Sequence, residues 1–211
     1  MALAGLGALP ALLVPRGGAR SGGALPPASA APSPAIALWL LCAAAGGAAV
    51  AAIEIGAVAL ALRFGHPPAL AILFTVPLCL AAVAGGLWVS WRNRRPGRAL
   101  VVAQLGLMTL GAGLVALNLS MAVTVLGAVL VGAVLAPLGT HYSLTLDALA
   151  PPHRRAELFA LLRTANSLGV ILASALLTAG SLSLALAAIA ALIAGVTLVV
   201  AFATLRRPPP A

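Results

Sequence analysis

The sequence predicts an all-α membrane protein with six transmembrane helices, and three observations support this prediction. Apolar side chains make up 63% of the 211 residues and charged side chains 7%, whereas roughly a quarter of the residues in a soluble domain are charged. Six apolar stretches approach or exceed the roughly 20 residues that a helix needs to cross the hydrocarbon core. The basic residues are all arginine and lie mostly in short clusters between these stretches, which is typical of membrane loops.

This composition excludes a soluble globule, because three acidic residues cannot solvate the surface of a domain of this size. The net charge of +9 does not indicate nucleic-acid binding, since apolar stretches separate the arginine clusters. We therefore expect the lipid bilayer as a partner and no nucleic acid. Arginine without lysine, together with abundant alanine, glycine and proline, is typical of a high-GC bacterial genome.

The first two predicted spans are separated by a segment that ends a helix. They cover residues 36–62 and 69–91, and residues 63–68 between them contain one arginine, one glycine and two adjacent prolines. Proline lacks a backbone donor and glycine permits a turn, so both end helices. The second span contains Pro77, and the arginine-rich segment 92–98 follows it.

The other four spans have equally short connections. They are separated by the turn at Asn118 and by the segments 151–155 and 180–181. Pro137 and Gly139 predict a break within the fourth span, and transporters use such helix breaks near their binding sites. Short connections also favour consecutive helices as antiparallel neighbours. The predicted spans are 99–117, 119–146, 156–179 and 182–205, followed by a tail at 206–211.

The arginines predict the orientation in the membrane. One side has Arg63 alone, and the opposite side has ten: Arg16, Arg20, Arg92, Arg94, Arg95, Arg98, Arg154, Arg155, Arg206 and Arg207. The positive-inside rule then places both termini in the cytoplasm, for a multi-pass protein of the inner (cytoplasmic) membrane. Three tryptophans fall at the inner ends of the first two spans, as an aromatic belt predicts: Trp39, Trp88 and Trp91.

Residues 1–35 differ from the six-helix domain at 36–205. The apolar run 1–14 is too short to span comfortably and lacks the basic start of a signal peptide. Residues 15–35 are rich in proline, glycine, alanine and serine, which predicts a flexible linker. One interpretation is that the apolar run is the inner end of a preceding transmembrane helix.

Glu54 is the first candidate functional residue, because an ionisable group inside a span is costly and is therefore a functional hypothesis. It lies eight residues before the end of the first span. A carboxyl group at this depth can carry a proton, which makes Glu54 the proton-coupling candidate. The alternative is a carboxyl group that is hydrogen-bonded within a helix contact or reaches a water-filled vestibule.

The fifth span carries a polar stripe that we expect to line a cavity, because polar groups cannot favourably face lipid tails. Alternatively, Ser and Thr bond to carbonyls of their own helix, and Arg163 extends its side chain to the interface. The stripe, spaced for one helical face, consists of Arg163, Ser167, Ser174, Thr178 and Ser181, with Asn166 beside it.

The end of the fourth span adds His141 as another candidate for the substrate cavity. Asp147 follows it, and we interpret this acid as part of an interfacial helix end close to Arg154 and Arg155. Glu157 is interpreted as an acid at a helix start, where it complements the helix dipole.

Catalytic and metal-binding patterns are absent from the sequence. It contains no serine-protease, zinc-ligand or Walker A motif, and no nucleophile with a base at usable spacing. We therefore predict no enzyme activity, no metal and no cofactor. Cys42 and Cys79 lie inside apolar runs without CxxC spacing, so we expect both to be buried side chains.

Three segments carry a resemblance to a known family. They are residues 53–56, residues 84–98 and residues 149–169. Together they resemble the C-terminal half, spans seven to twelve, of a bacterial efflux transporter of the major facilitator superfamily. The second segment is similar to a degenerate copy of the family's G-x-x-x-D-R-x-G-R-R loop signature without the Asp, through Gly85, Gly86, Arg92, Arg94, Arg95, Gly97 and Arg98.

The resemblance implies a secondary active transporter, with proton-coupled efflux of a small organic solute. Glu54 would carry the coupling proton. Alternating access would move this six-helix bundle against a second one. The residues implied to line the substrate cavity are His141, Arg163, Asn166, Ser167 and Ser174.

The family is built from two six-helix halves, and this chain resembles one of them. We therefore expect a second half as partner, either another copy of the chain or a separate chain. The alternative is a non-transporting membrane protein, such as a truncated inactive fragment or an accessory subunit.

Overall fold

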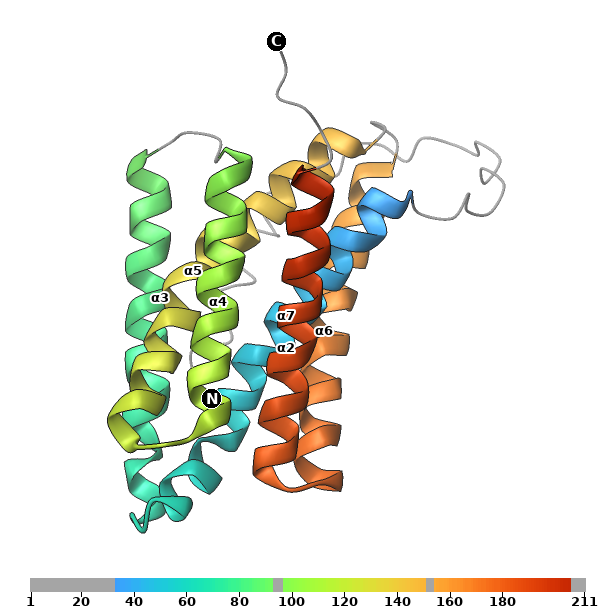
Figure 1. Ribbon diagram of the computed structural model, residues 1–211. Helices are drawn as coiled ribbons and strands as arrows, with labels where there is room; N and C mark the ends of the chain where they lie inside the picture. Colours follow the sequence, from blue (N-terminus) through green and yellow to red (C-terminus); the bar gives the residue numbers. More distant parts are fainter. Residues whose placement is uncertain (1–32, 93–96, 151–153, 206–211) are drawn as a thin grey trace, which may run out of the picture. The chain divides into compact units, whose positions relative to one another are not determined.

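The chain forms an all-α bundle of six long helices in a computed structural model that describes residues 33–92, 97–150 and 154–205. All of these residues belong to one unit within 32–211. Each of the six helices is long and apolar enough to cross a membrane, which confirms the predicted fold class. In chain order (Figure 1) they are α2 (Pro34–Arg63), α3 (Ile72–Arg92, preceded by the 3-10 turn Pro68–Ala71), α4 (Arg98–Leu117), α5 (Met121–Leu149), α6 (Arg155–Ala179) and α7 (Leu182–Leu205).

Serine side chains cap several of these helices. The backbone N–H of Ile36 donates to Ser33 Oγ at 3.4 Å, and that of Val123 donates to Ser120 Oγ at 3.3 Å. Such caps satisfy backbone donors that the first turn leaves unpaired. The helices therefore begin at Pro34 and Met121, close to the predicted starts at about 36 and 119. The predicted tail at 206–211 and the linker up to residue 32 lie outside the described residues.

The predicted break in the fourth span is wrong. The helix α5 continues through Pro137 and Gly139 to Leu149, and α3 likewise continues through Pro77. A proline within a helix removes one backbone donor and crowds the preceding turn, and in both helices the remaining backbone bonds maintain the helix. The predicted turn at Asn118 is confirmed, because this residue ends α4 in a left-handed conformation with φ of 52°.

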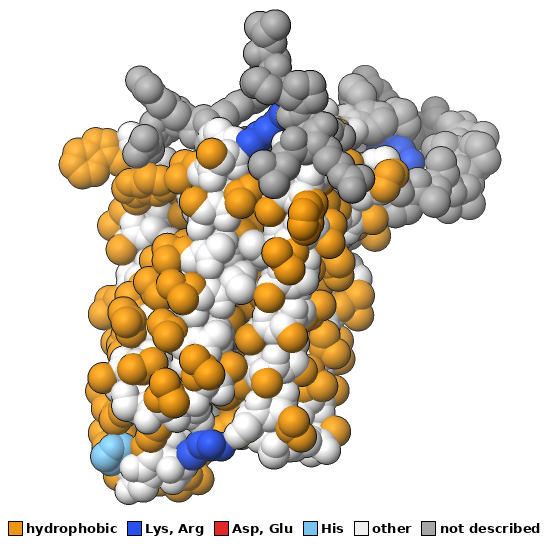
Figure 2. Space-filling view, viewed as in Figure 1, with side chains coloured by type: hydrophobic (Ala, Val, Ile, Leu, Met, Phe, Trp, Pro, Cys, Tyr) orange, Lys and Arg blue, Asp and Glu red, His pale blue; other side chains and the backbone are white. Residues whose placement is uncertain are grey.

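Large apolar side chains cover the outside of the bundle. Leu80, Leu87 and Leu184 are each more than 60% exposed, and Figure 2 shows apolar side chains along the whole viewed face, with arginines near its ends. A surface of this kind requires an apolar solvent. The chain is therefore a multi-pass membrane protein.

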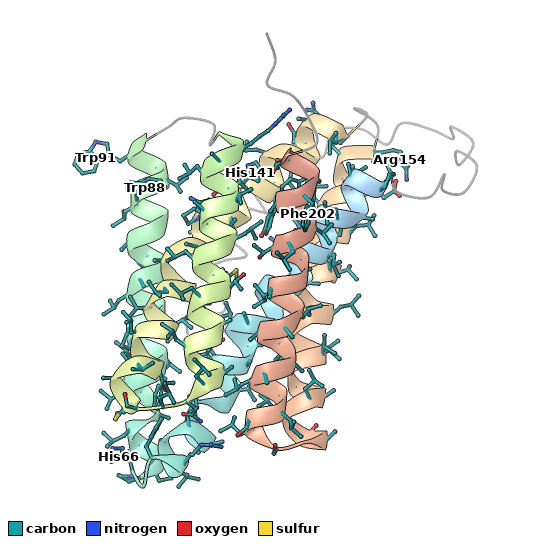
Figure 3. All side chains as sticks on the ribbon, in the orientation of Figure 1. His66, Trp88, Trp91, His141, Arg154 and Phe202 are labelled. Atoms are coloured by element: carbon teal, nitrogen blue, oxygen red, sulfur yellow. The ribbon has the colours of Figure 1, made fainter. Side chains whose placement is uncertain are left out.

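The two ends of the bundle differ as the sequence predicted. Trp88, Trp91 and Arg154 lie toward one end, and His66 lies toward the other (Figure 3). Asp147 and Arg155 form an ion pair of 3.3 Å at the arginine-rich end. Trp91 is 92% exposed, as expected for a side chain in the interfacial belt of a membrane.

The helix contacts do not follow chain order. The helix α2 packs most extensively against α6, and α3 packs most extensively against α5, while α2 and α3 contact each other far less. The consecutive helices α2 and α3 are thus neighbours, as expected, but they are not each other's main packing partners. A short connection fixes only where two helices meet at their ends, and their sides remain free to choose other partners.

Small residues bring these helix pairs together. A Cβ atom on Gly169 of α6 would collide with the backbone carbonyl of Ala44 in α2, and one on Gly85 of α3 would collide with that of Ala133 in α5. Close backbone approach at small residues is the usual basis of helix packing in membranes.

The first three helices and the last three form an internal repeat. Exchanging α2 with α5, α3 with α6 and α4 with α7 maps the main helix contacts onto one another. Gly85 and Gly169, 84 residues apart, occupy equivalent packing positions, because an added Cβ atom on either one would collide with a backbone carbonyl of the facing helix. Because each repeat crosses the membrane three times, the two repeats have opposite orientations in it.

Candidate functional site

A groove with polar side chains lies between α2, α5 and α6. It consists of two hollows, a larger one of about 680 Å³ and a smaller one of about 400 Å³. The hollows adjoin, because Gly47, Leu135 and Asn166 line both of them. We call the two together the α2–α5–α6 groove.

The larger hollow gathers polar groups from α5 and α6. Arg163, Asn166 and Ser167 come from α6, and Tyr142 and Ser143 come from α5. The Tyr142 side chain is 5% exposed, and its hydroxyl has no hydrogen-bond partner among the described residues. Ser143 donates its hydroxyl proton to the carbonyl of Gly139 at 3.0 Å, so its oxygen remains able to accept a hydrogen bond.

Gly47 makes room for Asn166 at the point where α2 crosses α6. A Cβ atom on Gly47 would lie 2.6 Å from Asn166 Oδ1 and 2.7 Å from the Asn166 backbone oxygen. The absence of a side chain at Gly47 therefore allows the amide of Asn166 to lie between the two hollows.

Glu54 lines the smaller hollow together with Val170 of α6. Its side chain is exposed, and it has no hydrogen bond or ion pair among the described residues. Among the described residues, the Glu54 carboxyl group therefore opens into the groove and makes no hydrogen bond within a helix contact.

The other two described acids are paired with arginines at the end of the bundle. Glu157 accepts from Arg154 at 2.8 and 2.9 Å, and this ion pair raises the pKa of Arg154. Asp147 pairs with Arg155. The interpretation of both acids as helix-end residues is thereby confirmed.

Arg163 therefore has no acidic partner among the described residues. It lies three residues before Asn166, while Glu54 lies seven residues after Gly47, which faces Asn166. At about 1.5 Å of rise per residue, the two charged side chains start roughly 15 Å apart along the bundle. The groove thus has a basic end and an acidic end.

His141 and Ser174 do not line the groove. The His141 ring packs edge-on against Trp39, with ring centroids 5.0 Å apart, and lies 3.3 Å from the Thr145 hydroxyl. Ser174 donates to the carbonyl of Val170 at 2.9 Å, and Thr178 donates to that of Ser174 at 2.9 Å. The polar stripe of α6 therefore divides, with its beginning in the groove and its end bonded to its own helix.

The residues of the loop signature have separate structural roles. Gly85 and Gly86 lie within α3, Gly97 precedes α4, and Arg98 is the first residue of α4. Arg92 is the last residue of α3, while Arg94 and Arg95 lie outside the described residues. Gly85 contacts α5 closely, so packing explains its need for a small residue.

Sequence reasoning did not select Tyr142, although it lines the larger hollow. Its spacing from Leu135, Leu138 and Gly139, which line the same hollow, is that of one helical face, and this signal could have identified it. No comparable signal indicates Gly47, because its role depends on contact with a helix more than 100 residues later.

No family model and no curated protein matches this sequence. The fold defines the class, a six-helix multi-pass membrane protein of all-α type. Its particular feature is a groove with an acidic and a basic end, built on two three-helix repeats.

Proposed function

We propose that the protein is a secondary active transporter of the major facilitator type, in which this chain supplies one six-helix half. The observation that carries the proposal is the α2–α5–α6 groove, which places Glu54, Arg163 and Asn166 on one open face of the bundle. Transporters bind solutes at mid-membrane sites lined by such groups.

The internal repeat supports the same function. Inverted repeats of three helices within each six-helix half are a feature of major facilitator transporters. The described helices have this arrangement, with α2–α6 and α3–α5 as equivalent pairs. Two repeats of opposite orientation provide similar packings toward both sides of the membrane, which alternating access requires.

Glu54 is the proposed proton carrier for efflux of a small organic solute. Its carboxyl group lies in the smaller hollow without a basic partner among the described residues, so protonation breaks no ion pair. A group of this kind can gain a proton on one side of the membrane and lose it on the other.

A second six-helix half would complete the groove. Polar groups that face lipid are penalised, and Arg163, Asn166 and Ser167 are all exposed on this bundle. We propose a second copy or a separate chain of similar fold as the cover, with the arginine-rich end of the bundle in the cytoplasm of a bacterial cell.

The test is proton-driven transport in proteoliposomes that contain the full chain and any partner purified with it. We expect Glu54→Gln to abolish gradient-driven transport, because glutamine cannot exchange a proton at any pH of the assay. Glu157→Gln is the matched control, since that acid lies at the start of α6, and it should transport as the wild type does. Gradient-driven transport by Glu54→Gln at the wild-type rate would remove Glu54 from the mechanism.

A further inference from the structure

We infer that the larger hollow binds a small organic anion. Arg163 would bind the carboxylate of this anion, and the apolar part of the anion would pack against α5 and α6. This inference rests on the proposed transport function and names the class of solute. Neither the composition nor the resemblance indicates whether the solute is a cation, an anion or neutral.

The charge of the hollow favours an anion. Arg163 is the one charged side chain among the described residues that line it. Asp147 and Glu157 are engaged with Arg155 and Arg154, and Glu54 lies roughly 15 Å away along the bundle. A guanidinium at membrane depth without a counter-ion is unfavourable, and a carboxylate can bind it through two parallel hydrogen bonds.

A second observation is independent of this charge. The Tyr142 hydroxyl is buried in the wall of the same hollow and has no hydrogen-bond partner among the described residues. Unpaired buried hydroxyls are rare, because the group loses its water without gaining a partner. Tyr142 can donate to a ligand oxygen, and a carboxylate held at Arg163 supplies acceptors.

The rest of the lining describes the body of the ligand. Met108, Leu138, Phe159 and Leu162 supply apolar and aromatic surface, and Asn166 adds one amide. The volume of about 680 Å³ falls within the range of about 300–1,000 Å³ that is usual for pockets of small organic molecules. Apolar and aromatic side chains beside a single guanidinium suit an aromatic or aliphatic monocarboxylate.

An anionic group can reach Arg163 from two sources. One is a free carboxylate solute, and the other is the phosphate of an anionic lipid, because Arg163 is in the first turns of α6. Both would satisfy the same guanidinium. We assign the site to the solute, because the unpaired Tyr142 hydroxyl and apolar side chains line the same hollow as Arg163.

The test measures binding to the full chain in phosphatidylcholine nanodiscs. Three probes share one ring system and differ in charge: 2-naphthoate, 2-naphthylmethanol and 2-naphthylmethylamine. We expect 2-naphthoate to bind at least about tenfold more tightly than the other two, as one charge-assisted bidentate contact predicts. Preference for the amine would overturn the inference and leave the proposed transport function standing.

Variants then assign the selectivity to residues. Arg163→Gln should remove the preference for 2-naphthoate, Arg163→Lys should retain part of it, and Tyr142→Phe should weaken 2-naphthoate binding by about fivefold. Arg63→Gln is the control, because Arg63 bonds to Ser183 away from the groove, and it should bind as the wild type does. Unchanged affinity in Arg163→Gln and Tyr142→Phe would overturn the inference.

Phosphatidylglycerol nanodiscs separate the two sources of the anion. A solute site retains its preference for 2-naphthoate when this lipid replaces phosphatidylcholine. If 2-naphthoate fails to bind, and phosphatidylglycerol stabilises the wild type against heat but not Arg163→Gln, the site belongs to a lipid headgroup and the inference is wrong. Glu54→Gln should still bind 2-naphthoate, because Glu54 lies outside the larger hollow. If the wild type binds 2-naphthoate but transports nothing, the transport proposal is refuted and the binding site stands.

Discussion

The two repeats of the bundle share their packing but differ in their polar residues. In α6 the positions that reach the groove carry Arg163 and Asn166, whereas the positions 84 residues earlier in α3 carry Cys79 and Ala82. Equivalent glycines, by contrast, are kept at both close helix crossings.

This difference shows that packing and chemistry are specified separately in this molecule. Close helix approach needs a small residue at each crossing, and both repeats satisfy that need in the same way. The groove needs charged groups on only one side of the bundle. The hollow beside α3, of about 540 Å³, has an almost entirely apolar lining that includes Ala81, Ala84 and Leu107.

The largest expected effect concerns the opposite orientation of the repeats. Gly97 precedes α4, and Gly180 lies in the short turn between α6 and α7, so the two should face opposite sides of the membrane. In a Cys79→Ala background, which removes an exposed thiol, a membrane-impermeant maleimide should label Gly97→Cys and Gly180→Cys from opposite sides only. Labelling of both from the same side would contradict the inverted repeat.

An intermediate effect is expected at the shared crossings. Gly169→Ala and Gly85→Ala should each destabilise the bundle by about 2–3 kcal/mol, because the added methyl group collides with backbone in the facing helix. Gly106→Ala is the control, since nothing lies within 4 Å of an added Cβ there, and alanine favours helix by about 1 kcal/mol. The stability of all three variants can be measured as the heat-induced loss of monodisperse protein in detergent. If only one of Gly169→Ala and Gly85→Ala is destabilising, the two crossings are not equivalent and the repeat is contradicted.

The smallest effect is expected where the repeats meet each other. Thr109 of α4 and Thr197 of α7 share a hydrogen bond of 2.9 Å between equivalent helices. A double-mutant cycle with Thr109→Val and Thr197→Val should give a coupling energy of about 0.6 kcal/mol, the usual value for such bonds in membranes. A coupling near zero would mean that the hydroxyls serve only their own helices, as Thr109 already does by donating to Leu105.

The six helices could be predicted because their length and apolar composition are local properties. The turn at Asn118 and the acid at the start of α6 were likewise predictable, since helix ends use nearby side chains. The interpretation of Pro137 failed because the backbone bonds on either side of this buried residue, together with its packing in the bundle, maintain α5. Cys79 is exposed, and not buried as expected, because in a membrane bundle an apolar residue can face lipid.

The candidate site was only partly predictable for a related reason. Glu54 and Arg163 could be selected individually, because charges within spans are rare. Their placement along one groove depends on the close approach of α2 and α6 at Gly47 and Gly169, which no local pattern reveals. Ser174 shared the helical spacing of the groove residues, but its hydroxyl bonds to its own helix.

The composition of α2 limits which mutations this protein can accept. Eleven of the fifteen buried residues in α2 are alanine or glycine, so neighbouring helices lie almost directly against its backbone. A larger side chain at Gly47 would collide with the backbone of α6, whereas Leu80 or Leu184 on the lipid-facing surface can change to other apolar residues at little cost. A saturation mutagenesis profile should therefore show α2 restricted to the smallest side chains, and natural variation in the chain should concentrate on the surfaces that contact lipid.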